Sequence, residues 1–129
     1  MDSTQYRRFS GVVGVATVGL AVVFVVVIGA DVFETPETAL LVSALVLAGI
    51  LDLVAALDTP VTERIAWYRI SGIAHIILGT VFSLWFASAL GSGLLAIIAF
   101  LVLLLSTAGV GLDMLLFEGR HVYKEPLER

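Results

Sequence analysis

The sequence has no cysteine, a single lysine and few charged residues of either sign. Without cysteine, the chain has no disulfides, no thiolate metal ligands and no cysteine nucleophile. Only 14% of its residues are charged, and the formal net charge is −4. A nucleic-acid-binding protein needs a clustered basic surface, so this charge balance argues against a nucleic-acid partner.

The basic residues are almost all arginine, with six arginines and one lysine, and the sequence pI is near 4.9. Acidic surfaces stay hydrated at high salt, so an excess of acids suits a high-salt cytoplasm. This balance predicts a halophilic archaeon as the source.

Hydrophobic residues make up 60% of the chain, and its mean hydropathy is +1.08. Blocks of about 20 apolar residues match a hydrocarbon core of about 30 Å at about 1.5 Å per residue. The chain has four such blocks, which predicts an all-α, polytopic membrane protein built as a four-transmembrane-helix bundle. The predicted domain covers residues 1–117, with spans at about 9–30, 38–57, 66–89 and 94–117. Residues 118–129 are predicted to form a short, loosely ordered cytoplasmic tail.

Helix signals divide these blocks. Thr35-Pro36 and Thr59-Pro60 are typical helix starts, because Pro fits the first helical position. Residues 60–66 are predicted to form a short interfacial helix or turn leading to Trp67 and Tyr68 at headgroup level. Gly119 is expected to end the fourth span. The first block follows two arginines, so a signal peptide cleaved after Ala30 is an alternative, although its apolar run is longer than a usual signal core.

The basic residues also predict the orientation. All seven lie at the N-terminus, in the middle connection or in the C-terminal tail. Four spans place these three regions on one side of the membrane. Short basic segments favour the cytoplasm, which predicts a multi-pass plasma-membrane protein with both termini cytoplasmic.

Two aspartates lie within the predicted spans, Asp52 and Asp113. A charged aspartate inside a membrane costs about 2.5–3.5 kcal/mol unless it is paired or protonated. Arg8 and Arg69 begin spans on the same side, and their long side chains can reach into the bundle. Arg–Asp clamps near the cytoplasmic face are therefore predicted. The alternative is that an aspartate binds a proton or ion on a transport pathway.

A third intramembrane polar group is His75, which lies on one helical face with Ser71, Gly72, Gly79 and Phe82. Small residues allow close helix approach, so this face is expected to point into the bundle. His75 either relays or senses protons or is simply hydrogen-bonded to a serine or carbonyl. His75 and the aspartates show no metal-ligand spacing, so no metal is predicted.

Small residues at helical spacing predict three further packing seams. These are Ser10, Gly14, Thr17 and Ala21 in the first span; Ala48, Asp52 and Ala55 in the second; and Ser106, Gly109 and Asp113 in the fourth. The last two seams place both aspartates on protein-facing sides.

The two halves of the chain share a spaced motif. Arg8-x-Ser10-Gly11 matches Arg69-x-Ser71-Gly72, and Leu51-Asp52 matches Leu112-Asp113, all at an offset of 61 residues. Two tandem helical hairpins would explain the match. Such a repeat would be parallel, with its pseudo-two-fold axis along the membrane normal.

Catalytic and nucleotide-binding motifs are not found, which predicts a non-enzymatic protein without a cofactor. The first hypothesis is an accessory or structural membrane component, in contact with lipid and with either further copies of itself or a larger membrane-protein partner. The second is a small proton- or ion-coupled transporter or channel that uses Asp52, Asp113 and His75.

Overall fold

The computed structural model describes residues 3–123 and Leu127, and every regular element in that part of the chain is helical. Four helices are long: α1 (Ser3–Ile28), α2 (Pro36–Ala56), α4 (Trp67–Ala89) and α5 (Leu94–Phe117). Three are short: η1 (Gly29–Phe33), α3 (Pro60–Arg64) and α6 (Arg120–Tyr123). The predicted all-α, four-helix architecture is confirmed.

All four long helices are long and apolar enough to cross a membrane. The third and fourth begin and end within one residue of their predicted bounds, whereas α1 begins at Ser3, six residues before the predicted span. In α1 the β-branched run Val25-Val26-Val27 is helical rather than extended. In lipid the backbone has to hydrogen-bond within its own segment, and only a helix allows that.

Both Thr-Pro pairs start helices, as predicted. Thr59 forms a capping box with Thr62, and Pro60 takes the first position of α3. Thr35 precedes Pro36 in the same way, but its hydroxyl lies 2.6 Å from that of Thr38 instead of capping a backbone N–H. At the end of α5, Gly119 has a φ of +75° and its N–H donates to Asp113 O at 3.0 Å, which ends the helix.

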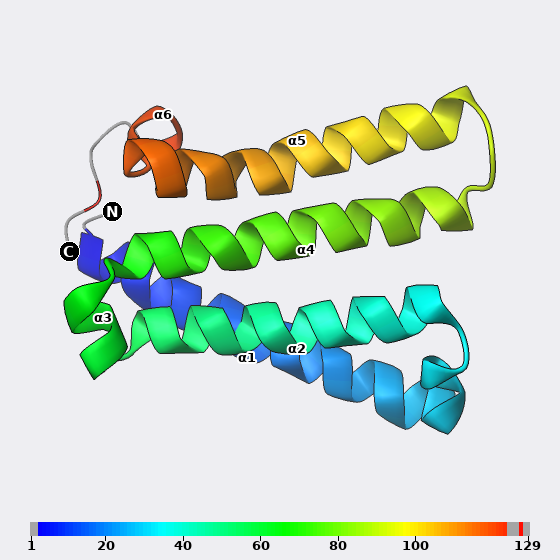
Figure 1. The fold of residues 1–129 in the computed structure, drawn as a ribbon, viewed down its shortest axis with the longest axis horizontal. Helices are drawn as coiled ribbons and strands as arrows, with labels where there is room; N and C mark the ends of the chain where they lie inside the picture. Colours follow the sequence, from blue (N-terminus) through cyan, green and yellow to red (C-terminus); the bar gives the residue numbers. More distant parts are fainter. Residues whose placement is uncertain (1–2, 124–126, 128–129) are drawn as a thin grey trace.

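The helices form two antiparallel hairpins, α1–α2 and α4–α5, that meet through α2 and α4 (Figure 1). The start of α1, α3 and α6 lie at one end, which we call the basic end because it carries Arg7, Arg8, Arg64, Arg69 and Arg120. The η1 segment and the α4–α5 connection lie at the opposite end.

The two hairpins do not pack symmetrically. α2 and α4 share a long interface, whereas α1 touches α4 only briefly and forms no extended interface with α5 in the part of the chain that is described. A parallel repeat with a two-fold axis would make the α1–α5 interface as long as the α2–α4 interface. The tandem repeat therefore stays a prediction.

Glycine pairs bring the backbones together within each hairpin. A Cβ added to Gly111 would lie 2.5 Å from Gly72 O, and one added to Gly14 would lie 2.8 Å from Gly49 O. Neither position has room for a side chain, so α4 contacts α5 and α1 contacts α2 through the main chain. Such close approach is how helices associate in lipid, where there is no hydrophobic drive between them.

Buried apolar residues form a cluster at each end of the bundle. Near η1, Val32 packs with Ala21, Leu41, Val42 and Leu45. At the basic end the cluster contains Ala55, Ala66, Trp67, Tyr68, Ile70, Met114 and Leu127. Trp67 and Tyr68 are thus buried core residues, at 3% and 4% exposure, and face the protein interior. Their position at headgroup level stays a prediction. They turn inward because α1, α2 and the folded-back tail cover this end of α4.

The seams predicted in the first and second spans are confirmed, since all of their residues are buried. The seam predicted in the fourth span is wrong. Ser106 is exposed and an added Cβ on Gly109 would meet nothing within 4 Å, while Ala108 and Gly111 face α4. Small residues occur at helical spacing on two faces of α5, the face with Ser106 and Gly109 and the face with Ala108 and Gly111. Contact with Gly72 and Gly79 of α4 selects the second face for packing.

Candidate functional site: a buried carboxylate between three helices

Asp52 is a fully buried carboxyl group, with 0% exposure near the basic end of α2. Its Oδ1 accepts hydrogen bonds from Ser10 Oγ of α1 at 2.9 Å and from Ser71 Oγ of α4 at 2.5 Å. The two serine oxygens are 3.2 Å apart, and both serines are buried. We call Ser10, Asp52 and Ser71 the Asp52 cluster. It connects three of the four long helices through one oxygen atom.

Local sequence explains how these groups meet. Ala48 and Ala55 flank Asp52 on its face of α2 and are both 0% exposed, so the neighbouring helices approach closely there. Serine is short enough to fit between such helices and still donate a hydrogen bond. With both serines on Oδ1, the buried Oδ2 has no hydrogen-bond partner in the part of the chain that is described.

His75 lies one turn beyond Ser71 and is half-buried. Its Nδ1 is 2.9 Å from the carbonyl oxygen of Ser71. A carbonyl only accepts, so Nδ1 carries a proton and donates it. His75 thus makes the bond to a carbonyl that the simpler interpretation of the sequence expects, and it is close to the Asp52 cluster.

A small cavity of about 30 Å³ separates His75 from α1 and α5. A cavity needs about 10–15 Å³ to hold one water molecule, provided that polar groups line it. Ser10, Ser71 and His75 supply polar groups here, and the remaining lining is mainly aromatic: Tyr6, Phe9, Val13, Trp67, Met114 and Tyr123. The arrangement can hold a proton or a water molecule beside the Asp52 cluster.

Asp113 makes a separate set of contacts. Its Oδ1 accepts from His121 Nδ1 at 2.6 Å and its Oδ2 accepts from Val122 N at 3.0 Å. The carboxylate therefore holds the first turn of α6 against the end of α5, and we call this contact the Asp113 cap. Leu127 is buried at 6% exposure and donates its N–H to Glu118 O at 2.8 Å.

The tail is thus docked wherever it is described, and the prediction of a loosely ordered tail is wrong for residues 118–123 and 127. Tyr123 packs against Tyr6 with ring centroids 4.4 Å apart and the rings tilted by 57°, which joins the tail to α1. Burial raises the pKa of Tyr123 above 10.0, with smaller contributions from Tyr6, Asp113 and Asp52.

The predicted Arg–Asp clamps are not formed within the described residues. Arg8 and Arg69 are exposed and make no ion pair with Asp52 or Asp113. Each arginine precedes its serine by two residues, which is about 200° around a helix, so it points away when the serine faces inward. The two carboxylates are instead held by hydroxyl, imidazole and backbone N–H groups.

The arginine that does tie helices together is Arg7, which sequence reasoning missed. Its Nε donates to Ala55 O at 3.0 Å and an Nη donates to Leu57 O at 2.7 Å, while the other Nη lies 2.8 Å from Asp58 Oδ1. Arg7 precedes Ser10 by three residues and so shares its face. The free carbonyls at the end of α2, which has no basic residue in its last turn, were the available signal.

The comparison with protein families then gives a match along almost the whole chain. A model of a family of unknown function (DUF7994) matches residues 5–128. The chain belongs to this family. No curated protein and no solved structure matches it.

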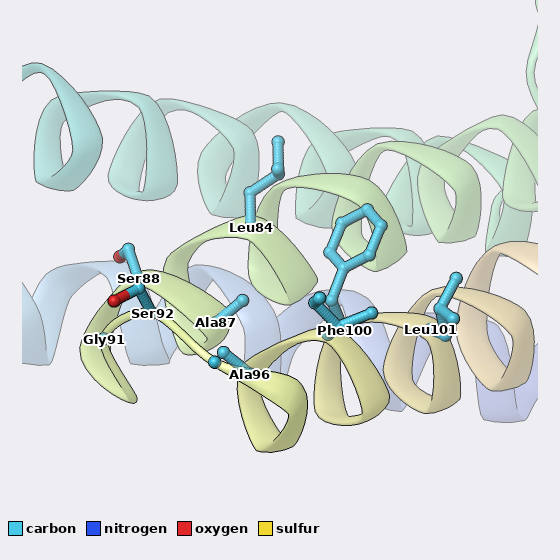
Figure 2. Close-up of a pocket in the computed structure, with 10 residues that line it drawn as sticks. Leu84, Ala87, Ser88, Gly91, Ser92, Ala96, Phe100 and Leu101 are labelled. Carbon is cyan, nitrogen blue, oxygen red and sulfur yellow. The ribbon is translucent and has the colours of Figure 1, made fainter.

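In this DUF7994 protein a larger and quite different hollow lies at the opposite end, between α4 and α5 (Figure 2). It measures about 640 Å³, and Leu84, Ala87, Ala96, Phe100 and Leu101 form most of its surface. Ser88 and Ser92 supply the only side-chain hydroxyls in the lining. Polar chemistry is therefore concentrated at the basic end of the DUF7994 bundle.

The described residues also include no group of three or more His, Asp and Glu side chains placed to hold a metal ion. The chemistry that this DUF7994 site can offer is that of a carboxyl group, two hydroxyls and an imidazole: hydrogen bonding and proton exchange.

Proposed function

We propose that this DUF7994 protein is a small, non-enzymatic structural or accessory component of the plasma membrane. The observation that carries the proposal is the Asp52 cluster, in which a fully enclosed carboxylate binds α1 and α4 to α2. A carboxylate with no exposed surface is better placed to join helices than to exchange solutes. The Asp113 cap and Arg7 add two further ties at the same end.

The outward surface of the bundle supports a role within the bilayer. Large apolar side chains are exposed along the long helices, for example Val26 at 75%, Leu94 at 73% and Leu105 at 71%. Lipid, further copies of the chain or a larger membrane protein would cover them. The arginines at the basic end support a cytoplasmic position for that end.

Purification of the full chain in mild detergent tests the accessory role. Chemical cross-linking in the membrane, followed by light scattering in detergent, should give an oligomer or a complex with a second membrane protein. A monomer that captures no partner under either condition would contradict the proposal.

A second candidate is a small proton- or ion-coupled transporter that uses Asp52, His75 and Asp113. Two observations favour it: Asp52 Oδ2 has no hydrogen-bond partner among the described residues, and both serines of the Asp52 cluster line the small cavity beside His75. Asp52→Asn and Asp113→Asn in reconstituted vesicles separate the two candidates, with Ser106→Ala, which removes an exposed hydroxyl of α5, as the control. A transporter loses proton flux on Asp52→Asn while remaining folded. If Asp52 is structural, the wild type shows no proton flux, and Asp52→Asn lowers the stability of the fold.

A further inference from the structure

A groove of about 550 Å³ runs along the outer surface of the α1–α2 hairpin. Its lining is apolar apart from Arg8, which lies at the basic end of the groove, and it contains no acidic residue. The other lining residues are Gly11, Val12, Val15, Ala16, Leu53, Ala56 and Leu57. Small side chains at Gly11, Ala16 and Ala56 leave the hollow between the two helices.

Arg8 carries a positive charge at the mouth of this groove and has no acidic partner among the described residues. It is exposed and forms no ion pair or hydrogen bond with the described residues. Asp58, which follows the end of α2, is already 2.8 Å from Arg7. Asp58 is also 96% exposed, and an exposed acid is costly in hydrocarbon, so we expect this level of the bundle to lie at the membrane–water boundary.

The groove is nearly as long as one leaflet of the hydrocarbon core is thick. Arg8 to Ala16 spans about 12 Å of α1 at about 1.5 Å per residue. One leaflet contributes about 15 Å of a hydrocarbon core of about 30 Å. The groove therefore extends from headgroup level through most of one leaflet, with a cation at the top and only apolar surface below.

We infer that this groove binds one phospholipid with an anionic headgroup, whose phosphate pairs with Arg8 and whose acyl chain lies between α1 and α2. Arginine presents paired N–H donors that suit a phosphate, and basic residues beside grooves between membrane helices bind anionic headgroups. A zwitterionic lipid would fill the same apolar surface but would gain less from Arg8. A site of this kind goes beyond general contact with the bilayer, because it selects by charge.

Native mass spectrometry of the full chain in mild detergent tests the inference. The probes are dioleoylphosphatidylglycerol, which is anionic, and dioleoylphosphatidylcholine, which is zwitterionic, added at equal concentration. Wild type should retain the anionic lipid in preference. Arg8→Gln should lower retention of the anionic lipid roughly fivefold, since a basic residue near a headgroup contributes about 1 kcal/mol, and should leave the zwitterionic lipid unchanged.

Two matched pairs of variants separate charge from shape. Arg64→Gln removes an exposed arginine of α3 that does not line the groove, and it should leave retention unchanged. Ala16→Trp fills the groove and should lower retention of both lipids, whereas Val26→Trp on the same helix, about 15 Å away at about 1.5 Å per residue, should not. Both tryptophans replace exposed residues, and circular dichroism checks that helix content is kept.

The inference is overturned if wild type holds the two lipids equally, because the groove then does not select by charge. It is also overturned if Arg64→Gln acts as strongly as Arg8→Gln, which would indicate diffuse attraction to a basic surface. Retention that survives Ala16→Trp would place the lipid elsewhere.

Discussion

Removing the hydroxyl of Ser71 tests whether the Asp52 cluster stabilises the fold. Ser71→Ala deletes the 2.5 Å hydrogen bond to Asp52 Oδ1 at a position with 0% exposure, where water cannot replace the donor. A hydrogen bond to a charged group contributes about 1.5–3 kcal/mol, and polar contacts between membrane helices average about 0.6 and reach about 1.7 kcal/mol. We therefore expect a loss of about 1–2 kcal/mol in the free energy of unfolding.

The companion variant is Ser10→Ala, which removes the longer bond of 2.9 Å to the same oxygen. Each single variant leaves Oδ1 with one donor, whereas the double variant leaves the carboxyl group with none. The double variant should therefore lose more stability than the two single losses added together, because a buried acceptor without any partner bears the full desolvation cost.

Equilibrium unfolding in mixed micelles measures these differences. Ser106→Ala is the matched control, since Ser106 is exposed on α5 and its hydroxyl donates only to Leu103 O within its own helix. Its effect should stay within about 0.5 kcal/mol. If Ser71→Ala is no more harmful than Ser106→Ala, the Asp52 cluster does not hold the helices together, and the reasoning behind the proposed structural role fails.

Three further predictions concern other parts of the molecule. Gly111→Ala should destabilise the α4–α5 hairpin by about 1–3 kcal/mol, because its Cβ would lie 2.5 Å from Gly72 O. Gly109→Ala is the control and should not destabilise the hairpin, since its Cβ would meet nothing within 4 Å. Thermal unfolding compares the two variants. Tyr123 should ionise above 10.0 when its absorbance is titrated in a Tyr6→Phe, Tyr68→Phe background. Because the folded state raises this pKa, the contribution of Tyr123 to tail docking is complete below about pH 10 and is lost as pH rises through the folded value; ionisation at the ordinary pKa would refute its burial. The chain has no cysteine, so single cysteines at Asp58 and Ser92 report topology directly: an impermeant maleimide applied outside intact cells should label Ser92→Cys and spare Asp58→Cys, and the reverse pattern would invert the orientation.

Prediction from sequence was most successful where a single physical constraint dominates. The bilayer requires about 20 apolar residues per crossing, and a helix satisfies the backbone hydrogen bonds of a segment in lipid. The four spans therefore follow from hydropathy and the Thr-Pro starts, although α1 begins six residues before its predicted span. Small residues around Asp52 likewise placed that carboxylate inside the protein, since a lipid-facing acid at that position would be too costly.

Which partner each polar side chain contacts depends instead on the direction in which it points from its helix and on which helices pack together. Arg8 and Ser10 are neighbours in sequence but point in opposite directions, so burial of the serine turned the arginine outward and left Arg7 to bind the end of α2. On α5 the seams Ser106–Gly109 and Ala108–Gly111 are equally plausible by spacing, and only contact with Gly72 and Gly79 of α4 decides between them.

By itself, the amino-acid sequence determined the number, length and helical state of the spans and the burial of Asp52, because hydrophobic length and the cost of an unpaired charge act on each segment alone. Tertiary structure decided that Ser10 and Ser71 meet on one oxygen of Asp52, and that residues 121–122 fold back onto Asp113. It also decided that α1 and α5 share no extended interface in the described part of the chain. Those outcomes depend on which helix faces approach one another, and that choice is made by packing between segments distant in the chain.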